Sequence, residues 1–187
     1  MMDSAKITTA IFTATNEIRL RFKLSLLVYS DILEKSALLH SSSMVQMNFF
    51  SHTNHFNKQF ADVMKRVQHC KGNFNLVGEN LAFHSFVKDG VIKITYPSLF
   101  RKSTSTYELL SPEEYGKGVV DAWMASPGHR ANILNASYSF IGVGSVLTRK
   151  NIEGHSVPYA MVTQNFGAHL NYSLFSNFKN VGRTLYI

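Results

Sequence analysis

The sequence lacks the features that mark several specialised classes of protein. Its 187 residues include one cysteine, Cys70, so no disulfide can form within the chain and the fold cannot rest on a disulfide framework. No stretch approaches the roughly 20 consecutive apolar residues of a membrane-spanning helix, and no Gly-X-Y period, heptad run or low-complexity tract is present. Folding at this length buries roughly 70% of the surface that the unfolded chain exposes, so we expect one compact domain with its own core.

Acidic residues are also few, because 12 Asp and Glu stand against 19 Lys and Arg, a formal net charge of +7. The excess is +1 over residues 1–50, +4 over 51–110 and +2 over 111–187. No run of five basic residues occurs, and no nucleic-acid-binding motif accompanies the charge. We therefore expect a solvated basic surface and no nucleic-acid partner.

A secretory signal is not visible at the start of the chain. A signal peptide needs a basic start and an apolar run of roughly 7–15 residues before its cleavage site. Residues 1–16 carry Asp3 instead, and Thr and Ser interrupt their apolar positions. The residues alone leave the compartment open.

The first third of the chain predicts a strand followed by two helical segments. Residues 18–26 alternate strictly between apolar and polar side chains, which is the period of a half-buried strand. Asp31 and Glu34 have the spacing of a capping box, and apolar residues follow them at helical intervals as far as Met44. A second amphipathic segment spans about 56–67.

The middle of the chain carries the clearest start signals. Residues 76–86 are rich in strand formers, and Asp89-Gly90 then predicts a hairpin turn. Ser111-Pro112-Glu113-Glu114 supplies an N-cap, a proline at the first helical position and an acidic first turn. Ser126-Pro127 repeats that signal, so a second, short helix should follow the first.

The last part of the chain predicts sheet. Residues 138–147 and 159–166 have strand character, and a turn near Glu153-Gly154 joins them. Helices precede strands with little regular alternation. This order favours an α+β or layered α-β-α arrangement over a doubly wound sheet.

Three short segments combine turn residues with a titratable side chain, and they contain His52, Glu79 and His129. Two imidazoles and a carboxylate form the ligand set of an open zinc site, with water in the fourth position. With Ser126 as a hydrogen-bonding N-cap, His129 is the third residue of a helix, where the helix dipole favours the neutral, metal-binding imidazole. Taken singly, each is more often a capping or surface residue, and no zincin or zinc-finger spacing links them.

Taken together, these segments resemble the motifs of the CAP superfamily, whose domains are also called SCP domains, in its bacterial-type form. The resemblance runs from Asn16 to Gly167, and the motifs in this order form a highly specific combination. They are Asn16-Glu17-Ile18-Arg19, a helix ending in His40 and Met44, Phe50-Ser51-His52, Gly78-Glu79-Asn80-Leu81, the string WMASPGHRANIL from Trp123 to Leu134, Ile141-Gly142-Val143-Gly144 and Gln164-Asn165-Phe166-Gly167.

The resemblance implies an α+β fold, a three-layer α-β-α sandwich, with a cleft where two His and two acidic residues bind zinc or another divalent cation. It places His52, Glu79 and His129 at three of these four positions. At the fourth, animal-type relatives carry Glu and this chain carries Ser126, so a bound metal would meet less negative charge. The resemblance also replaces the strand at 18–26 with helix. Further side chains expected to line the cleft are Asn80, Asn132 and Gln164.

The resemblance also divides the chain. Residues 1–15 form a lead-in, 16–167 the CAP domain and 168–187 a C-terminal extension, while 87–110 form a longer central insert than bacterial-type relatives usually carry. The insert mixes basic and aromatic residues, which suits a partner, glycan or lipid surface. The extension carries apolar residues that we expect to pack on the body or to contact a partner.

Two functions from different classes follow. The first is a binding protein that takes a small apolar ligand or a protein partner without turnover, because relatives include sterol and lipid binders and secreted effectors; the resemblance likewise favours an extracellular location. The second is a metal-assisted hydrolase, in which a divalent ion on His52, Glu79 and His129 lowers the pKa of bound water toward roughly 7. The lack of a clear second acid/base group or oxyanion donor set favours the binding protein.

Overall fold

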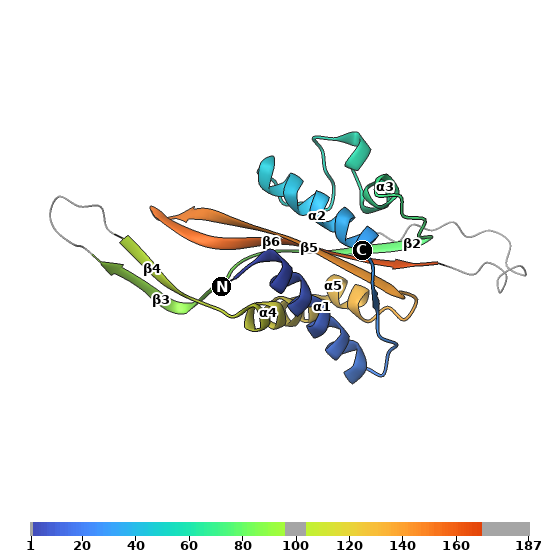
Figure 1. The fold of residues 1–187 in the computed structure, drawn as a ribbon, viewed down its shortest axis with the longest axis horizontal. Coiled ribbons are helices and arrows are strands. Elements are labelled where there is room, and N and C mark those ends of the chain that lie inside the picture. The colour runs from blue at the N-terminus through green and yellow to red at the C-terminus, as the bar shows by residue number, and fades with distance from the viewer. Residues whose placement is uncertain (1, 96–103, 170–187) are drawn as a thin grey trace, which may run out of the picture.

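A four-stranded sheet with helices on both faces forms the body of the molecule (Figure 1). The computed structural model describes residues 2–95 and 104–169. The sheet order is β1-β5-β6-β2, with β1 parallel to β5 and the other neighbours antiparallel. The strands are β1 (Val28–Tyr29), β2 (Leu76–Ser85), β5 (Phe140–Ile152) and β6 (His155–Ala168).

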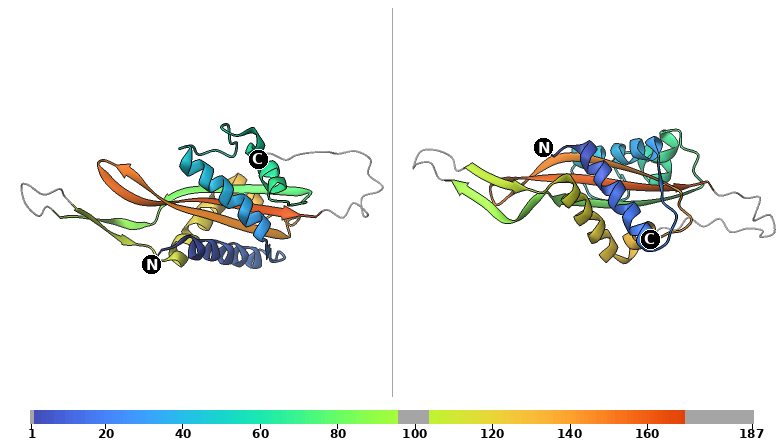
Figure 2. Two further views of the ribbon diagram at one scale, coloured as in Figure 1. Left: turned by 45° about the horizontal axis from the view of Figure 1, so that its top comes forward. Right: turned by 60° about the horizontal axis from the view of Figure 1, so that its bottom comes forward.

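Helices cover the two faces in separate groups, which the two views of Figure 2 show. The first group packs over the larger part of the apolar core, and the second packs on the opposite face. This arrangement confirms the predicted three-layer α+β sandwich. The first group is α1 (Ser4–Arg21), α4 (Pro112–Ala125) and α5 (Pro127–Ile133), and the second is α2 (Asp31–Gln46), α3 (Val63–His69) and the 3-10 turn η1 (Lys58–Phe60).

Helix α1 replaces the strand predicted over 18–26 as far as Arg21, and residues 22–26 form a turn and irregular chain. The helix starts at an Asp3 cap, whose carboxylate accepts from Lys6 N at 2.8 Å, and runs to Arg21. The alternation misleads because Arg19 points inward and is fully buried. Its guanidinium donates to the backbone carbonyls of Ser25 and Ile133, each at 2.8 Å, so a charged residue occupies a core position of the helix.

The helices α2, α4 and α5 begin where the sequence predicts, but the capping of α2 and α5 differs from the prediction. At α4 the capping box is present, because Ser111 Oγ accepts from Glu114 N and a Glu114 carboxylate oxygen accepts from Ser111 N. Helix α2 is capped by Ser30, one residue before the Asp31 of the predicted box. Ser126 stands at the N-cap of α5, but its side chain makes no cap hydrogen bond, so the predicted cap bond is wrong.

The central insert forms a second sheet of two strands, β3 (Val87–Thr95) and β4 (Thr104–Leu109). The turn predicted at Asp89-Gly90 is wrong, because β3 continues through these residues and accommodates them as a shift of register between Val87 and Ile92. The remainder of the insert, 96–103, and the extension from 170 onward lie outside the described residues, and so does the packing predicted for that extension.

The two long strands are joined by the predicted turn at Glu153-Gly154. Both residues have positive φ, 51° and 83°, as a two-residue type I′ hairpin requires.

Near the start of β5, Gly142 and Gly144 let α2 approach this strand closely. A Cβ at either glycine would lie 2.1 Å from a backbone nitrogen of α2. Only glycine permits this approach, which fixes the height of α2 above the sheet.

Candidate functional site

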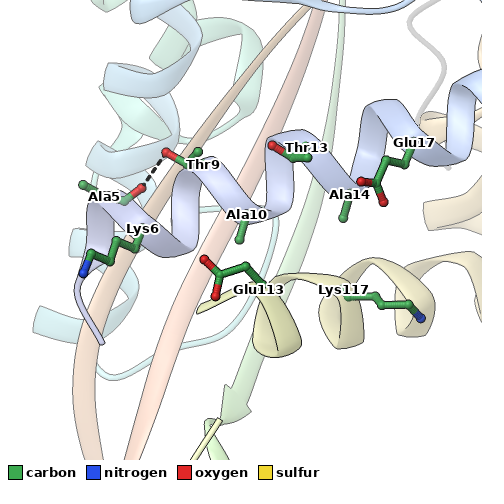
Figure 3. Close-up of a pocket in the computed structure, with 9 residues that line it drawn as sticks. All are labelled: Ala5, Lys6, Thr9, Ala10, Thr13, Ala14, Glu17, Glu113 and Lys117. Carbon is green, nitrogen blue, oxygen red and sulfur yellow. Dashed lines mark hydrogen bonds between the residues drawn. The ribbon is translucent and has the colours of Figure 1, made fainter. Parts of the chain in front are cut away.

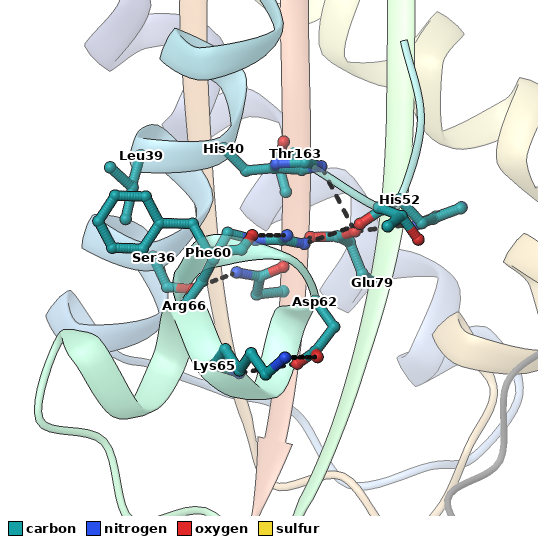
Figure 4. Close-up of polar contacts among 12 residues, drawn as sticks. Ser36, Leu39, His40, His52, Phe60, Asp62, Lys65, Arg66, Glu79 and Thr163 are labelled. Atoms are coloured by element: carbon teal, nitrogen blue, oxygen red, sulfur yellow. Dashed lines mark hydrogen bonds and ion pairs between the residues drawn. The ribbon is translucent and has the colours of Figure 1, made fainter. Parts of the chain in front are cut away.

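The carboxylate of Glu79 is the centre of a buried polar cluster between β2 and the α2 and α3 layer (Figure 4). Its Oε1 accepts from His52 Nδ1 at 2.9 Å, and its Oε2 accepts from Arg66 Nη2 at 2.6 Å. His40 Nε2 lies 3.9 Å from Oε1. Only 3% of the Glu79 side chain is exposed. We call Glu79, His52, Arg66 and His40 the Glu79 cluster.

Arg66 reaches this cluster because of how α3 begins. Asp62 caps the helix by accepting from Lys65 N at 2.9 Å, and one turn later Arg66 faces the sheet and is fully buried. Besides Glu79, the guanidinium donates to the carbonyl oxygens of Phe60 at 2.9 Å and His52 at 3.3 Å. It therefore ties the loop before α3 to the strand that carries Glu79.

The electrostatics of the cluster separate an ionised carboxylate from a neutral imidazole. Burial by itself would raise the pKa of Glu79, but the hydrogen bond from His52 and the charge of Arg66 outweigh it and hold the pKa below its usual range. Burial lowers the pKa of His40 to about 4, although the Glu79 charge opposes the shift. His40 is thus neutral near pH 7, and its Nε2 donates to Ser51 O at 2.9 Å.

Among the described residues, no hydrogen bond or ion pair links the His129 ring to His52 or Glu79. His129 sits in the first turn of α5 with its ring centroid 6.4 Å from that of Trp123. Burial lowers its pKa, and the nearby charge of His52 adds to that effect. Over residues 2–95 and 104–169, no three His, Cys, Asp or Glu side chains are grouped so that they could hold a metal ion.

The donor set therefore does not fit a three-ligand zinc site as it is arranged. Both oxygens of Glu79 already accept hydrogen bonds from protein groups, one of them from the fully buried cation Arg66. Each oxygen keeps a second lone pair, but only 3% of the side chain is exposed, so a metal ion has little access to it. Metal binding at His52, Glu79 and His129 stays a prediction that a titration must test.

The amides expected to line the cleft form an internal network on the opposite face of β2 from Glu79. Asn80 donates to Gln164 Oε1 at 3.0 Å and to His129 O at 3.3 Å. Asn132 donates to Asn80 Oδ1 at 2.9 Å, and Gln164 donates to Thr15 Oγ1 at 2.8 Å. Asn80 and Gln164 are fully buried, so these side chains hold α5 and α1 against the sheet.

Two hollows on the surface of the described part of the chain are large enough to hold a small molecule. The first, the helix groove, runs between α1 and α4 and encloses about 460 Å³. Figure 3 shows small side chains of α1 facing charged ones of α4. It holds no aromatic residue, and two acidic and two basic side chains line it. The helix groove is lined by Ala5, Lys6, Thr9, Ala10, Thr13, Ala14, Glu17, Glu113 and Lys117.

The second hollow, the aromatic groove, encloses about 560 Å³ beyond the C-terminal end of α2. Helix α2 has 16 residues and spans roughly 24 Å, whereas the 14 residues of β6 span roughly 46 Å. The β5–β6 hairpin consequently extends past the helix (Figure 1). The aromatic groove is lined by Met44, Val45, Asn48, Phe49, Phe50, Phe83, Thr148, Arg149, Lys150 and Met161.

Comparison with known proteins decides the family. The model of the CAP family, described as the cysteine-rich secretory protein family, matches residues 12–166. The chain belongs to the CAP family. Two solved structures share its fold. An extracellular protein containing an SCP domain from Bacillus anthracis str. Ames has a TM-score of 0.59 at 27% identity, over 88% of this chain and 41% of that one. An outer surface protein from Borrelia burgdorferi has a TM-score of 0.58 at 20% identity, over 90% of this chain and 97% of that one.

Curated CAP relatives are longer than this chain. The uncharacterized protein YkwD of Bacillus subtilis (strain 168) is 33% identical over 132 residues, which are 71% of this chain and 39% of YkwD. The uncharacterized membrane protein YlbC of the same strain is 27% identical over 134 residues, 72% of this chain and 30% of YlbC. This chain thus spans less than half of either relative. None of the helices in its described part combines the length and apolar character that a bilayer crossing demands.

Sequence reasoning missed Arg66 as part of the Glu79 cluster. The amphipathic pattern over 56–67 predicted one helical segment with an apolar face. The chain instead forms η1 and α3, and α3 buries Arg66 beside the apolar Val67. The one local signal was Asp62, whose capping position sets which residue of the next turn faces the sheet. The resemblance named the helix ending in His40 and Met44, but not the approach of the His40 imidazole to Glu79.

Proposed function

We propose that this chain is a CAP-family binding protein that holds a small apolar ligand with an acidic group in the aromatic groove and does not turn it over. The observation that carries the proposal is an apolar surface left open at the end of α2, next to the Glu79 cluster. Phe50, on its wall, precedes His52 by two residues.

The apolar character of the groove supports a ligand with a hydrocarbon body. Met44 and Met161 are almost fully buried beneath it, whereas Phe50 is 53% exposed. The rings of Phe50 and Phe83 pack with centroids 6.4 Å apart. The exposed part of Phe50 is apolar surface in contact with water, and it lies over the buried methionine side chains. A ligand that covers this surface removes it from water, which is favourable. The volume lies within the roughly 300–1,000 Å³ of small-molecule sites.

The charge at the rim supports an acidic group on the ligand. None of the lining residues is acidic. Lys150 Nζ lies 5.9 Å from the ring centroids of both Phe83 and Tyr159, and the described residues give it no carboxylate partner. Arg149 is held across the hairpin by Ser156, whose Oγ accepts from Arg149 Nε at 2.7 Å. A ligand carboxylate at the rim could accept a charge-assisted hydrogen bond from the Lys150 ammonium. We therefore propose a long-chain fatty acid as the ligand class.

The Glu79 cluster supports binding without turnover. In the hydrolase considered from the sequence, Glu79 would ligate a metal or act as a base on water. Both roles need a carboxylate lone pair that a metal or a water can reach. Each oxygen already accepts a hydrogen bond, from His52 or from Arg66, and only 3% of the side chain is exposed. A protein partner that inserts an apolar side chain remains the other occupant of the aromatic groove, and the experiment below separates it from a lipid.

Titration of the purified chain with a fluorescent long-chain fatty acid tests the proposal, beside its methyl ester, a sterol and unlabelled competitor. We expect Phe50→Ala to weaken binding about fivefold, since half a phenyl ring contributes roughly 1 kcal/mol. Lys150→Gln should weaken the acid about threefold and leave the ester unchanged. Phe22→Ala is the matched control, because Phe22 is 46% exposed and packs under Arg130 at the end of α1.

Binding that is unchanged in Phe50→Ala and Lys150→Gln would place the ligand elsewhere and refute the groove. No binding of any lipid by the folded protein would leave a protein partner as the occupant. Esterase or peptidase activity that disappears in Glu79→Gln would refute the absence of turnover.

A further inference from the structure

We propose that Arg66 takes the place of the metal ion in the CAP cleft of this chain, so that a cation built into the protein organises the cleft and no bound metal is needed. The inference concerns the Glu79 cluster and stands apart from the ligand proposed for the aromatic groove.

Four oxygen atoms accept hydrogen bonds from the two terminal nitrogens of the Arg66 guanidinium, whereas its buried Nε has no partner. The guanidinium donates to Glu79 Oε2 at 2.6 Å and to three backbone carbonyls, those of Phe60 at 2.9 Å, His52 at 3.3 Å and Ala61 at 3.4 Å. One carboxylate and several carbonyl oxygens are the ligands that proteins offer to hard cations. Arginine can serve in their place because its planar fork presents five donors and keeps its charge when buried.

The contacts do two tasks that a bound cation performs. They neutralise the buried Glu79 carboxylate, of which 3% is exposed. They also gather the loop from His52 to Ala61 onto the strand that carries Glu79, because the acceptors come from both ends of that loop. Removing one partner of such a buried pair is costly, since it leaves the other charge uncompensated.

The same contacts oppose a metal at this place. A divalent ion that approached Glu79 Oε2 would meet the positive charge of Arg66 at hydrogen-bond distance. An approach to Oε1 would have to displace the Nδ1 hydrogen bond of His52, at 2.9 Å. Bound in this way, His52 presents its other ring nitrogen away from Glu79, and 52% of its side chain is exposed. Glu79 therefore positions His52 and does not act as a free ligand.

The neighbouring Lys65 offers a matched control. It lies on the same helix, carries the same charge and is 51% exposed, with its Nζ 3.5 Å from Asp62 Oδ2. Arg66→Gln and Lys65→Gln remove equal charge from adjacent positions. Only the first of them frees the carboxylate of Glu79.

Two measurements test the inference: calorimetric titration with Zn²⁺, and thermal unfolding in EDTA, in buffer and in Zn²⁺. For the wild type and for Lys65→Gln, we expect that EDTA leaves the Tm unchanged. Any zinc that these proteins bind should bind equally well after His52→Ala or His129→Ala. For Arg66→Gln we expect a lower Tm that Zn²⁺ partly restores, with zinc affinity at least tenfold above the wild type and lost again in Arg66→Gln/His52→Ala.

Zinc binding by the wild type that His52→Ala or His129→Ala removes, or a wild-type Tm that EDTA lowers, would overturn the inference. An Arg66→Gln protein that folds but gains no zinc affinity would do the same. If Arg66→Gln does not fold, the double variant Arg66→Met/Glu79→Met removes both buried charges together. This double variant should fold and bind no more zinc than the wild type. Zinc binding by the double variant would count against the inference.

Discussion

The close approach of α2 to β5 can be tested by adding one methyl group. A Cβ on Gly144 would lie 2.1 Å from Leu38 N, 2.5 Å from Leu38 Cα and 2.6 Å from Ala37 C. All three are backbone atoms, so no side-chain rotation can make room. The Gly144→Ala protein must move α2 by roughly 1–2 Å to restore ordinary contact distances of about 3.5–4.0 Å.

The cost follows from this displacement. Overpacking a core usually lowers the free energy of unfolding by roughly 1–3 kcal/mol. Because the atoms in the way belong to the backbone of α2, we expect Gly144→Ala to lower it by about 3 kcal/mol. The movement also stretches the hydrogen bond from Ser41 Oγ to Gly144 O, now 2.9 Å. Because His40 precedes Ser41 on α2, the same movement shifts the wall of the Glu79 cluster.

Urea denaturation measures the effect, with Gly118→Ala as the control. Gly118 lies in α4, and a Cβ there meets nothing within 4 Å, so alanine should add roughly 0.5–1 kcal/mol through helix propensity. With a slope of roughly 2 kcal/mol per molar urea, the midpoints of the two variants should differ by about 2 M. A Gly144→Ala midpoint within about 0.3 M of the wild type would refute the backbone contact.

Two further changes probe buried basic groups. Arg19→Met leaves the carbonyls of Ser25, Ile133 and Asn135 without their donor, so urea denaturation should show a loss of about 3 kcal/mol, and a loss below about 1 kcal/mol would contradict this role. His40 has a pKa of about 4 in the fold, so between the usual value of about 6.5 and 4 the unfolded chain binds more protons than the folded one. Stability should therefore fall by about 3 kcal/mol as the pH drops through this window; urea midpoints of His40→Gln should depend less steeply on pH, and equal slopes would exclude His40 as the cause.

Local signals predicted the ends of the elements well. The capping box at Ser111 and Glu114 is present, and the turn at Glu153-Gly154 has the backbone conformation that its residues favour. Both signals involve atoms within a few residues of one another, so the tertiary structure has little influence on them. The cap bond expected at Ser126 is absent, although its backbone is extended as at an N-cap and its N–H donates to Trp123 O at 3.1 Å.

Long-range contacts limited the rest of the prediction. The alternation over 18–26 counted Arg19 as a solvent-facing residue, and only the carbonyls of a distant segment make its burial possible. The turn at Asp89-Gly90 was likewise expected from two residues, while pairing with β4 keeps this segment in a strand. In both cases the partner lies outside any local sequence window.

The candidate site was partly predictable for the same reason. The CAP resemblance identified His52 and Glu79, and the structure places them at hydrogen-bond distance. Arg66 carries no sequence signal for a site, because a lone basic residue on a short helix is usually solvated. Its position depends on the Asp62 cap and on carbonyl oxygens from a loop that forms only in the folded chain.

The outer edge of β2 has a consequence for self-association. β2 is the last strand of the four-stranded sheet, and such edges present backbone groups to which a second chain can add a strand. Here Trp123 Nε1 donates to Leu81 O at 2.8 Å, and Asn132 Nδ2 donates to Glu79 O at 3.1 Å. Side chains from α4 and α5 thus act as a substitute neighbour strand, and they protect this protein from edge-to-edge aggregation along β2.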